Sequence, residues 1–257
     1  MKLLKKLKQH QFLLEELVKR DFTKKYKRTV LGVAWSILSP LLMLFVLKLI
    51  FTHFFGRDTP HFTVYLFCGN IIYTYFSDAT KGGMSTIMEN SGIFTKVNVP
   101  KYLFLLSKNV QAFVNFLIIL GILFVFVALD GLAFTWKFFL LLYPICALVL
   151  FNVGIGMVLS ALFVFFRDIK YLYDVALRLL LYTSAIFYSV DKYPVEVQKW
   201  FLCNPIYVFI LYFRTIIIDG AIPSLLIHLL ILAYTGLALG IGCWMYKKYN
   251  RRFLYHV

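Results

Sequence analysis

A strongly basic run that stops at the edge of a long apolar segment constrains this chain more than any other feature. The run holds Lys19, Arg20, Lys24, Lys25, Lys27 and Arg28, and the apolar segment follows over 33–55. Positive charge beside a first membrane span marks the cytoplasmic side, and basic amphipathic helices lie in the membrane interface. The pattern predicts an N-terminal amphipathic interfacial helix over 1–32 that turns into a first membrane-spanning helix.

The composition places the chain among polytopic membrane proteins. Hydrophobic residues make up 61% of the 257 residues and charged residues only 15%, whereas a soluble domain has roughly half apolar and a quarter charged residues. A net charge of +15 would suggest nucleic acid as the partner of a soluble protein. The positive-inside rule explains this charge better, so we expect no nucleic-acid partner and an all-α integral membrane fold.

Six apolar segments are expected to cross the membrane as helices. They cover 33–55, 62–79, 109–129, 138–166, 173–190 and 223–245, and most have about the 20 residues that a bilayer requires. Basic residues concentrate before the first of these segments and after the last, which predicts that both termini are cytoplasmic. Small-residue spacings at Gly156 and Ser160, and at Gly236 and Gly240, permit close helix packing. We therefore expect one transmembrane domain over 1–257.

Two segments between the expected spans are candidates for functional roles. The cytoplasmic segment 81–108 is expected to hold short helical pieces that face a partner. Turn-forming residues should separate these pieces at Gly82-Gly83, at Asn90-Ser91-Gly92 and at Pro100. In the outer segment 191–222, the stretch 206–218 is almost wholly apolar apart from Arg214. It is too short to cross a bilayer, which predicts a re-entrant or interfacial helix.

Two features leave alternatives open. In the N-terminal helix, Asp21 and Lys25 stand four residues apart and can pair, and the helix is either a lipid anchor or also a docking platform for a cytoplasmic partner. Lys48, inside the first span, either extends to the outer interface or contacts an anionic substrate. His53, Arg57 and His61 would add to a cationic outer mouth, which slightly favours an anionic polymer.

The chain lacks the motifs of an energised enzyme. It contains no G-x-x-x-x-G-K-[ST] motif for binding ATP, and no H-E-x-x-H or G-x-S-x-G motif. Its four cysteines have no metal-ligand spacing and are interpreted as small apolar residues. We expect no catalytic, cofactor or metal site in this chain, so a transporter built on it would need its ATPase on another polypeptide.

Several of these features together resemble a known family. They are the basic run leading into Leu31-Gly32-x-x-Trp35-x-x-x-x-Pro40, the sequence Phe166-Arg167-Asp168-Ile169 after the fourth span, Asn204-Pro205-Ile206-Tyr207 with Arg214 in the last outer segment, and a basic C-terminus. In their order and spacing, over essentially the full length, they are similar to the membrane subunits of ABC-2 type exporters of polysaccharides and polyol phosphates, such as O-antigen, capsule and teichoic acid.

The resemblance implies a half-channel in a bacterial or archaeal cytoplasmic membrane. A second copy of the chain and two ATPase subunits, which bind ATP and magnesium, would complete the exporter. Its substrate would be a lipid-linked polysaccharide or polyol-phosphate polymer, moved outward among the membrane lipids. The alternatives are an ABC-2 exporter of small hydrophobic molecules or lipids and, in a different class, a membrane enzyme of glycan assembly.

The resemblance also implies roles for individual residues. Coupling to the ATPase falls on Thr86, Glu89, Asn90, Phe94 and Lys96, and the collar around the ATPase on Phe12, Leu17, Phe22, Tyr26 and Arg28. The conduit lining falls on Phe45, Lys48, Phe51, Tyr182, Phe187 and Tyr188, and the outer gate on Tyr193, Pro205, Tyr207 and Arg214. The aromatic residues among the conduit candidates could stack on sugar rings. The alternative for each is a lipid-facing or packing role.

Overall fold

The regular structure of the chain is helical throughout the part that the structure describes. This computed structural model describes residues 11–26, 32–54, 61–94, 99–249 and 252–254. The α-helices are α2 (Gln11–Tyr26), α3 (Trp35–Phe54), α4 (Phe62–Glu89), α5 (Ser91–Phe94), α6 (Tyr102–Leu129), α7 (Leu142–Phe165), α8 (Ile169–Thr183), α9 (Val195–Phe201), α10 (Pro205–Ile217) and α11 (Leu225–Tyr249). Short 3-10 helices are η1 (Gly32–Ala34), η2 (Trp136–Leu141), η3 (Val190–Lys192) and η4 (Arg252–Leu254). The all-α expectation is confirmed.

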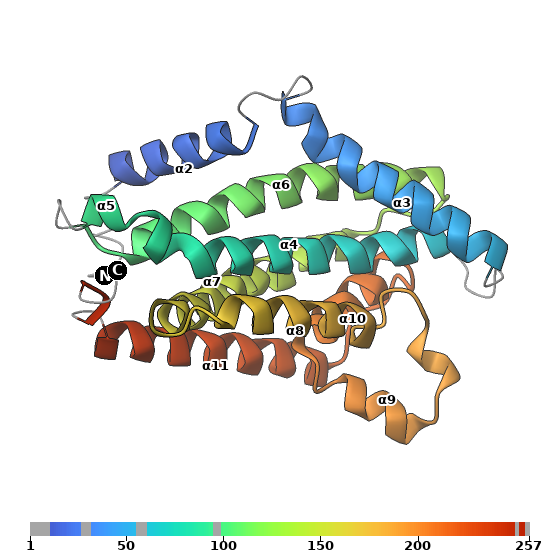
Figure 1. Cartoon of the computed structure of the whole chain (residues 1–257). Coiled ribbons are helices and arrows are strands. Elements are labelled where there is room, and N and C mark those ends of the chain that lie inside the picture. The colour runs from blue at the N-terminus through green and yellow to red at the C-terminus, as the bar shows by residue number, and fades with distance from the viewer. Residues whose placement is uncertain (1–10, 27–31, 55–60, 95–98, 250–251, 255–257) are drawn as a thin grey trace.

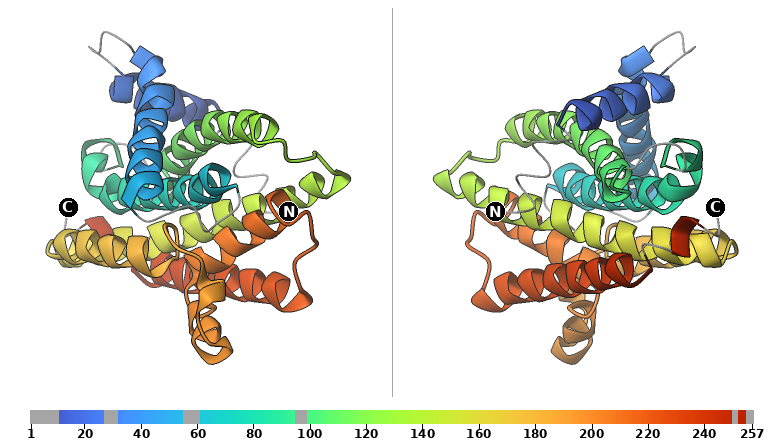
Figure 2. Two further views of the ribbon diagram at one scale, coloured as in Figure 1. Left: turned by 90° about the vertical axis from the view of Figure 1, so that its right-hand side faces the viewer. Right: turned by 90° about the vertical axis from the view of Figure 1, so that its left-hand side faces the viewer.

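Helix α7 lies at the centre of the bundle. It packs against α4 on one side and α11 on the other, while α4 also packs along α6. Helix α2 lies along α6, and α3 crosses α6 and contacts α4 toward the other end of the bundle (Figure 1). Figure 2 shows α2 and α3 on one side of the bundle and α9 on the opposite side.

Glycines allow α7 to approach its neighbours closely. A Cβ atom added at Gly154 would lie 2.5 Å from the main-chain carbonyl carbon of Ala238 in α11, and one at Gly83 in α4 would lie 3.2 Å from the Cα atom of Gly156. The close packing expected at Gly156 is therefore confirmed. Added Cβ atoms at Gly236 and Gly240 would meet nothing within 4 Å, because α11 uses a different face against α7.

Within the part of the chain that the structure describes, three helical segments are long and apolar enough to cross a membrane by length and composition. They are Tyr102–Leu129, Trp136–Phe165 and Leu225–Tyr249. Helices α9 and α10 would together make a fourth, and they are bent by 109° with respect to each other. The bend and the position of α10 match the helix expected within 191–222.

The expected boundaries of two other segments are wrong. Helix α4 runs without a break through Gly82 and Gly83 to Glu89, so these two glycines do not separate helical pieces as expected. The expected break at Asn90 is present, since α4 ends before it, the short α5 follows it and α6 begins only at Tyr102. The close contact of Gly83 with α7 stabilises the helical conformation at the two glycines. The expected fifth span, 173–190, is also too long, since α8 ends at Thr183.

A second apolar core joins five helices at one end of the bundle. Its buried residues are Leu17, Ile87, Phe104, Leu105, Met157, Ala161, Val164, Met245, Tyr246 and Phe253. They bring α2 and the C-terminal segment together with the ends of α4, α6, α7 and α11. Ser160 lies within hydrogen-bond distance of the Tyr246 hydroxyl, at 2.7 Å. Helix α2, the expected collar helix, is thus packed onto the bundle by its Leu17 side.

The close contact at Gly154 gives a test of this packing. Gly154→Ala places a methyl group against the α11 backbone, which cannot move aside as a flexible side chain would. We expect the unfolding free energy of the detergent-solubilised protein to fall by about 1–3 kcal/mol, seen as a lower melting temperature. Gly121→Ala in α6 is the matched control, because its Cβ atom meets nothing within 4 Å. Equal melting temperatures for the two variants would contradict the close contact.

Candidate functional site

A buried carboxylate joins the collar helix α2 to α6. Asp21 is only 3% exposed. Its side chain accepts a hydrogen bond from Ser107 Oγ at 2.8 Å and lies 3.7 Å from Lys108 Nζ. Gln111 Nε2 donates to the main-chain carbonyl of Asp21 at 3.0 Å. Helix α2 is therefore held by polar contacts of defined geometry as well as by its apolar side.

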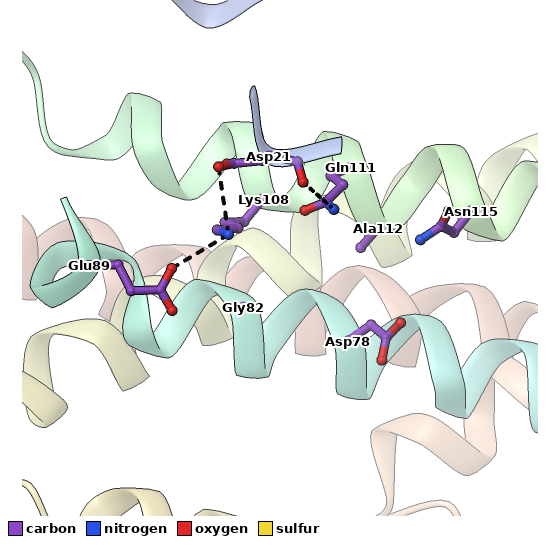
Figure 3. A pocket seen from close by; sticks show the side chains of 8 residues that line it. All are labelled: Asp21, Asp78, Gly82, Glu89, Lys108, Gln111, Ala112 and Asn115. Carbon is purple, nitrogen blue, oxygen red and sulfur yellow. Dashed lines mark hydrogen bonds and ion pairs between the residues drawn. The ribbon is translucent and has the colours of Figure 1, made fainter. Parts of the chain in front are cut away.

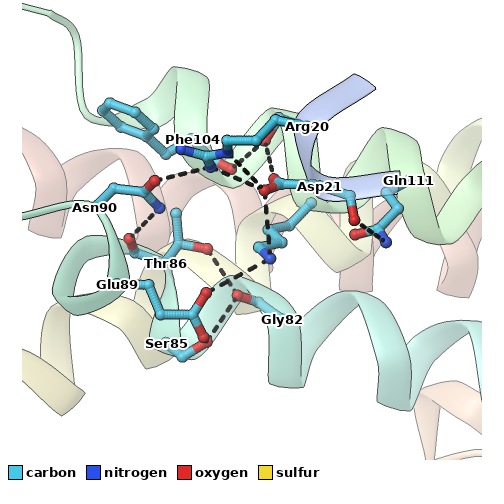
Figure 4. Close-up of polar contacts among 11 residues, drawn as sticks. Arg20, Asp21, Gly82, Ser85, Thr86, Glu89, Asn90, Phe104 and Gln111 are labelled. Carbon is cyan, nitrogen blue, oxygen red and sulfur yellow. Dashed lines mark hydrogen bonds and ion pairs between the residues drawn. The ribbon is translucent and has the colours of Figure 1, made fainter. Parts of the chain in front are cut away.

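Arg20 extends this network to the end of α4. Its guanidinium group donates to Asp21 Oδ1 at 2.8 Å and to Asn90 Oδ1 at 2.9 Å. Asn90 in turn donates through Nδ2 to the carbonyl of Thr86 at 2.9 Å, as Figure 4 shows. The residue that follows α4 is thus bound directly to the collar helix.

Lys108 connects the same network to Glu89. Its ammonium group lies 3.5 Å from Glu89 Oε2, and Ser85 donates to Glu89 Oε1 at 2.7 Å. We call the contacts among Arg20, Asp21, Glu89, Asn90 and Lys108 the coupling network. It joins α2, α4 and α6, and its members lie far apart in the sequence.

A cavity of about 330 Å³ lies beside the coupling network, between α2, α4 and α6 (Figure 3). It is lined by Asp21, Asp78, Gly82, Glu89, Lys108, Gln111, Ala112 and Asn115. Among the described lining residues, three are carboxylates and one carries an ammonium group. Among the described residues, no group of three or more His, Cys, Asp or Glu side chains could hold a metal ion.

At the opposite end of α4, a buried arginine organises the expected outer gate. Arg214 in α10 is 6% exposed and donates to the carbonyls of Ala185 at 2.9 Å, Ile186 at 3.1 Å and Tyr65 at 3.2 Å. Its guanidinium carbon also lies 3.4 Å from the centre of the Tyr65 ring. This one cation holds the turn after α8 against α4.

Local capping explains where α10 begins. Asn204 is the N-cap, and its side chain accepts from the backbone N–H groups of Ile206 at 3.0 Å and Tyr207 at 3.4 Å. Pro205 occupies the first turn of α10. Proline has no backbone N–H group, but an N–H group at this position would have no acceptor within the helix. Asn204 Nδ2 also donates to Ser184 Oγ at 2.9 Å. The cap therefore fixes α10 to the same turn that Arg214 holds.

The outer-gate residues cluster around aromatic rings. Tyr188 lies 6.3 Å from Tyr193 and 6.2 Å from Phe201, measured between ring centres, and Phe201 lies 5.4 Å from Tyr207. Tyr65 donates its hydroxyl to the carbonyl of Tyr188 at 2.7 Å. The structure thus brings Tyr193, Pro205, Tyr207 and Arg214 into one region. Near it, burial and the charge of Asp191 raise the pKa of Asp219 above its usual value.

The expected conduit residues are brought together only in part. Phe45 on α3 and Tyr182 on α8 are both exposed, and the ring of Tyr182 lies 6.2 Å from that of Phe187. Phe187 and Tyr188 follow the end of α8, so they lie in the turn that Arg214 holds rather than in the expected helix. The side chains of Lys48 and Phe51 lie outside the part that the structure describes.

The coupling and collar candidates have mixed outcomes. Thr86, Glu89 and Asn90 lie at the coupling network, as described above. Phe94 ends α5, while Lys96 and Arg28 fall outside the described residues, as do the side chains of Phe94 and Tyr26. On α2, Leu17 is buried, Phe22 is half-buried and Phe12 is exposed.

Sequence reasoning misses the positions of two residues that this geometry makes prominent. Asp21 faces α6, so the idea of a local pair with Lys25 overlooks its contacts with Ser107 and Lys108. Lys25 itself has no described side chain. Arg178 is an exposed charge within the expected fifth span, and a charge at such a position is the signal that could have found it.

Arg214 gives a test of the outer gate. Arg214→Lys keeps the charge but replaces the planar guanidinium group with a single ammonium group, which cannot reach all three carbonyls. We expect the melting temperature to fall, because each buried carbonyl left without a donor costs about 1–3 kcal/mol. Lys199→Ala, on the exposed surface of α9, is the control within the same segment. Equal melting temperatures for the two variants would show that Arg214 does not stabilise this segment.

Curated relatives resemble this chain over about three quarters of its length or more. The O-antigen export system permease protein RfbA of Klebsiella pneumoniae is 28% identical over 94% of this chain and 93% of its own. The polysialic acid transport protein KpsM of Escherichia coli is 23% identical over 91% of this chain and 92% of its own. The capsule polysaccharide export inner-membrane protein CtrC of Neisseria meningitidis serogroup B is 22% identical over 74% of this chain and 72% of its own.

A family model also matches most of the sequence. The model described as ABC-2 type transporter matches residues 13–218, from the collar helix through α10 and the residue that follows it. This range includes the coupling network and the outer gate. The chain belongs to the ABC-2 type transporter family.

Proposed function

We propose that this chain is the permease subunit of an ATP-driven exporter that moves a lipid-linked polysaccharide outward across the cytoplasmic membrane. The observation that carries the proposal is the match, over about three quarters of the chain or more, to proteins named for O-antigen export, polysialic acid transport and capsule polysaccharide export. The absence of an ATP-binding motif from the sequence fits a permease whose ATPase is a separate subunit.

The proposed topology has six membrane spans with both termini in the cytoplasm. Helices α6, η2 with α7, and α11 supply three of them, and α3, α4 and α8 are proposed for the others. The basic residues of the N-terminal segment and of 247–252 support this orientation. Helices α9 and α10 then form the outer gate as a bent pair that does not cross.

The coupling network is proposed to receive the force that ATP binding generates. Two ATPase subunits would bind beneath a pair of permeases, against α2 and the segment from Thr86 to Lys96. Because Arg20 bonds both Asp21 and Asn90, displacement of that segment would move α2 with it. Lys108 would carry the same displacement into α6 through Glu89 and Asp21.

The transport role is tested by following the glycan after depletion of this chain. Labelled sugar is supplied in a pulse, and surface polymer is then removed from intact cells with glycan hydrolases. We expect protected, lipid-linked polymer to build up inside the depleted cells and to disappear when the chain is restored. Normal surface glycan with no internal pool would refute polysaccharide export and favour a small hydrophobic cargo.

The coupling role is tested with Asp21→Asn. The variant keeps the size of the side chain and its hydrogen bond to Ser107, but it removes the charge that faces Arg20 and Lys108. In the complete permease–ATPase complex we expect export per ATP hydrolysed to fall severalfold. Co-purification of the ATPase should persist, which separates uncoupling from loss of assembly.

Glu16→Gln is the matched control for this experiment. Glu16 also lies on α2, but it pairs only with the exposed Lys19, at 3.0 Å, among the contacts described. This variant should couple normally. If Asp21→Asn exported normally per ATP hydrolysed, the coupling network would not transmit the ATPase movement. An equal loss of export in Glu16→Gln would lead to the same conclusion.

A further inference from the structure

The exposed side of α11 carries an apolar strip that ends in a lysine. Leu237, Ile241 and Trp244 are each half or more exposed, and Lys248, one turn further on, is also exposed. These four residues are three or four positions apart, so they lie in one line along the helix. The opposite side of α11 packs against α7. The strip therefore faces away from the bundle, and α11 lies at its edge (Figure 1).

Aromatic rings hold the lysine at the end of this strip. Lys248 Nζ lies 4.7 Å from the centre of the Trp244 ring and 5.4 Å from the centre of the Tyr249 ring. The guanidinium carbon of Arg252 lies 5.9 Å from the centre of the same Tyr249 ring. An aromatic ring attracts a cation through its quadrupole, but it does not neutralise the charge. These contacts therefore gather two cations beside one ring.

No carboxylate of the surrounding sequence balances these charges. Residues 220–257 contain no Asp or Glu, and Lys247 adds a third exposed cation beside Lys248. Within the described part of the chain, neither lysine forms an ion pair with a carboxylate. Like charges held this close repel each other, and a bound anion would relieve the repulsion. We call Trp244, Lys247, Lys248, Tyr249 and Arg252 the inner basic cluster.

The inner basic cluster is joined to the second apolar core. The ring of Tyr249 lies 5.3 Å from that of Phe165, measured between ring centres. Phe253, the residue after Arg252, is fully buried, and its ring lies 6.0 Å from Phe165 and 5.6 Å from Tyr246. An anion that contacts both Lys248 and Arg252 would therefore hold the end of α11 to η4. Binding at the cluster should stabilise this core.

The surroundings of the cluster identify the anion. Helix α11 is long and apolar enough to span a membrane, and tryptophan is enriched where a span meets the lipid headgroups. Trp244 thus places the basic side chains at headgroup level and the apolar strip beside the acyl chains. An anionic phospholipid supplies both a phosphate group for the cations and an acyl chain for the strip. Free phosphate would match only the cations.

Charge argues against a second copy of the chain as the occupant of this surface. In a symmetric pair, the same patch of each subunit faces its counterpart. Packing the two strips together would bring one inner basic cluster against the other, and like charges across an interface oppose association. A lipid headgroup carries the opposite charge and meets no such opposition.

We propose that the inner basic cluster binds the headgroup of an anionic phospholipid of the inner leaflet, with an acyl chain along the strip Leu237, Ile241 and Trp244. This inference goes beyond the proposed function, because it concerns the membrane around the exporter rather than the cargo. The two share only the assignment of α11 as a span with a cytoplasmic C-terminal end. The negative surface potential of the cytoplasmic leaflet favours binding at that end.

Tryptophan fluorescence can detect lipid at the cluster. The chain has four tryptophans, so replacing Trp35, Trp136 and Trp200 by phenylalanine leaves Trp244 as the single reporter. The full-length chain is placed in vesicles of phosphatidylcholine with a minor fraction of phosphatidylglycerol. Two matched preparations carry the same number of brominated acyl chains, which quench nearby tryptophan. The bromine is on phosphatidylglycerol in one preparation and on phosphatidylcholine in the other.

We expect brominated phosphatidylglycerol to quench Trp244 severalfold more than brominated phosphatidylcholine. The preference should disappear when Lys247→Gln and Lys248→Gln are combined, because the phosphate group then loses both ammonium partners. Lys199→Gln, on the exposed surface of α9, is the matched control and should keep the preference. Equal quenching by the two lipids, or a preference that survives in the double variant, would overturn the proposal. Quenching by neither lipid would also overturn it, by showing that protein covers the strip.

Thermal unfolding of the chain with all its tryptophans gives a second, independent measurement. A ligand that binds only the folded state raises the melting temperature. Phosphatidylglycerol added to the detergent-solubilised chain should therefore raise it more than phosphatidylcholine does, and the double lysine variant should lose this difference. Inorganic phosphate at the same concentration should have no such effect. An equal rise with phosphate would refute a lipid site and indicate a site for free anions.

Discussion

The close approach of α7 to its neighbours sets the positions of the other helices. Main-chain atoms of α7 and α11 meet at Gly154, where a single added methyl group would lie 2.5 Å from the α11 backbone. Gly83 and Gly156 make the corresponding contact between α4 and α7. Inside a membrane, water exclusion no longer drives helices together, so such backbone contacts carry much of the association. Both candidate sites depend on α4, and this contact fixes the position of α4.

Local signals made part of this fold predictable from the sequence. The all-helical class follows from composition, and the basic run marks the collar helix. The start of α10 follows from Asn204 and Pro205, because an N-cap and a first-turn proline act within a few residues. These features need no knowledge of how distant segments pack.

What could not be predicted depends on tertiary contacts. Asp21 accepts a hydrogen bond from Ser107, 86 residues away, and the spacing of residues along one helix cannot predict such a contact. Helix α8 stops at Thr183 because the carbonyls of Ala185 and Ile186 are bound by Arg214 in another helix. Similarly, Gly82 and Gly83 do not break α4, since packing against α7 outweighs their weak helix propensity.

The continuity of α4 has a mechanical consequence. One unbroken helix of 28 residues, about 42 Å long at 1.5 Å per residue, touches Arg214 near its start and Arg20 just beyond its end. Its close contact with α7 at Gly83 lies seven residues before Asn90 and 18 after Tyr65. A rigid rod pivoting there would have arms of about 10 Å and about 27 Å. Displacement at the inner end would then be amplified more than twofold at the outer gate, in the opposite direction.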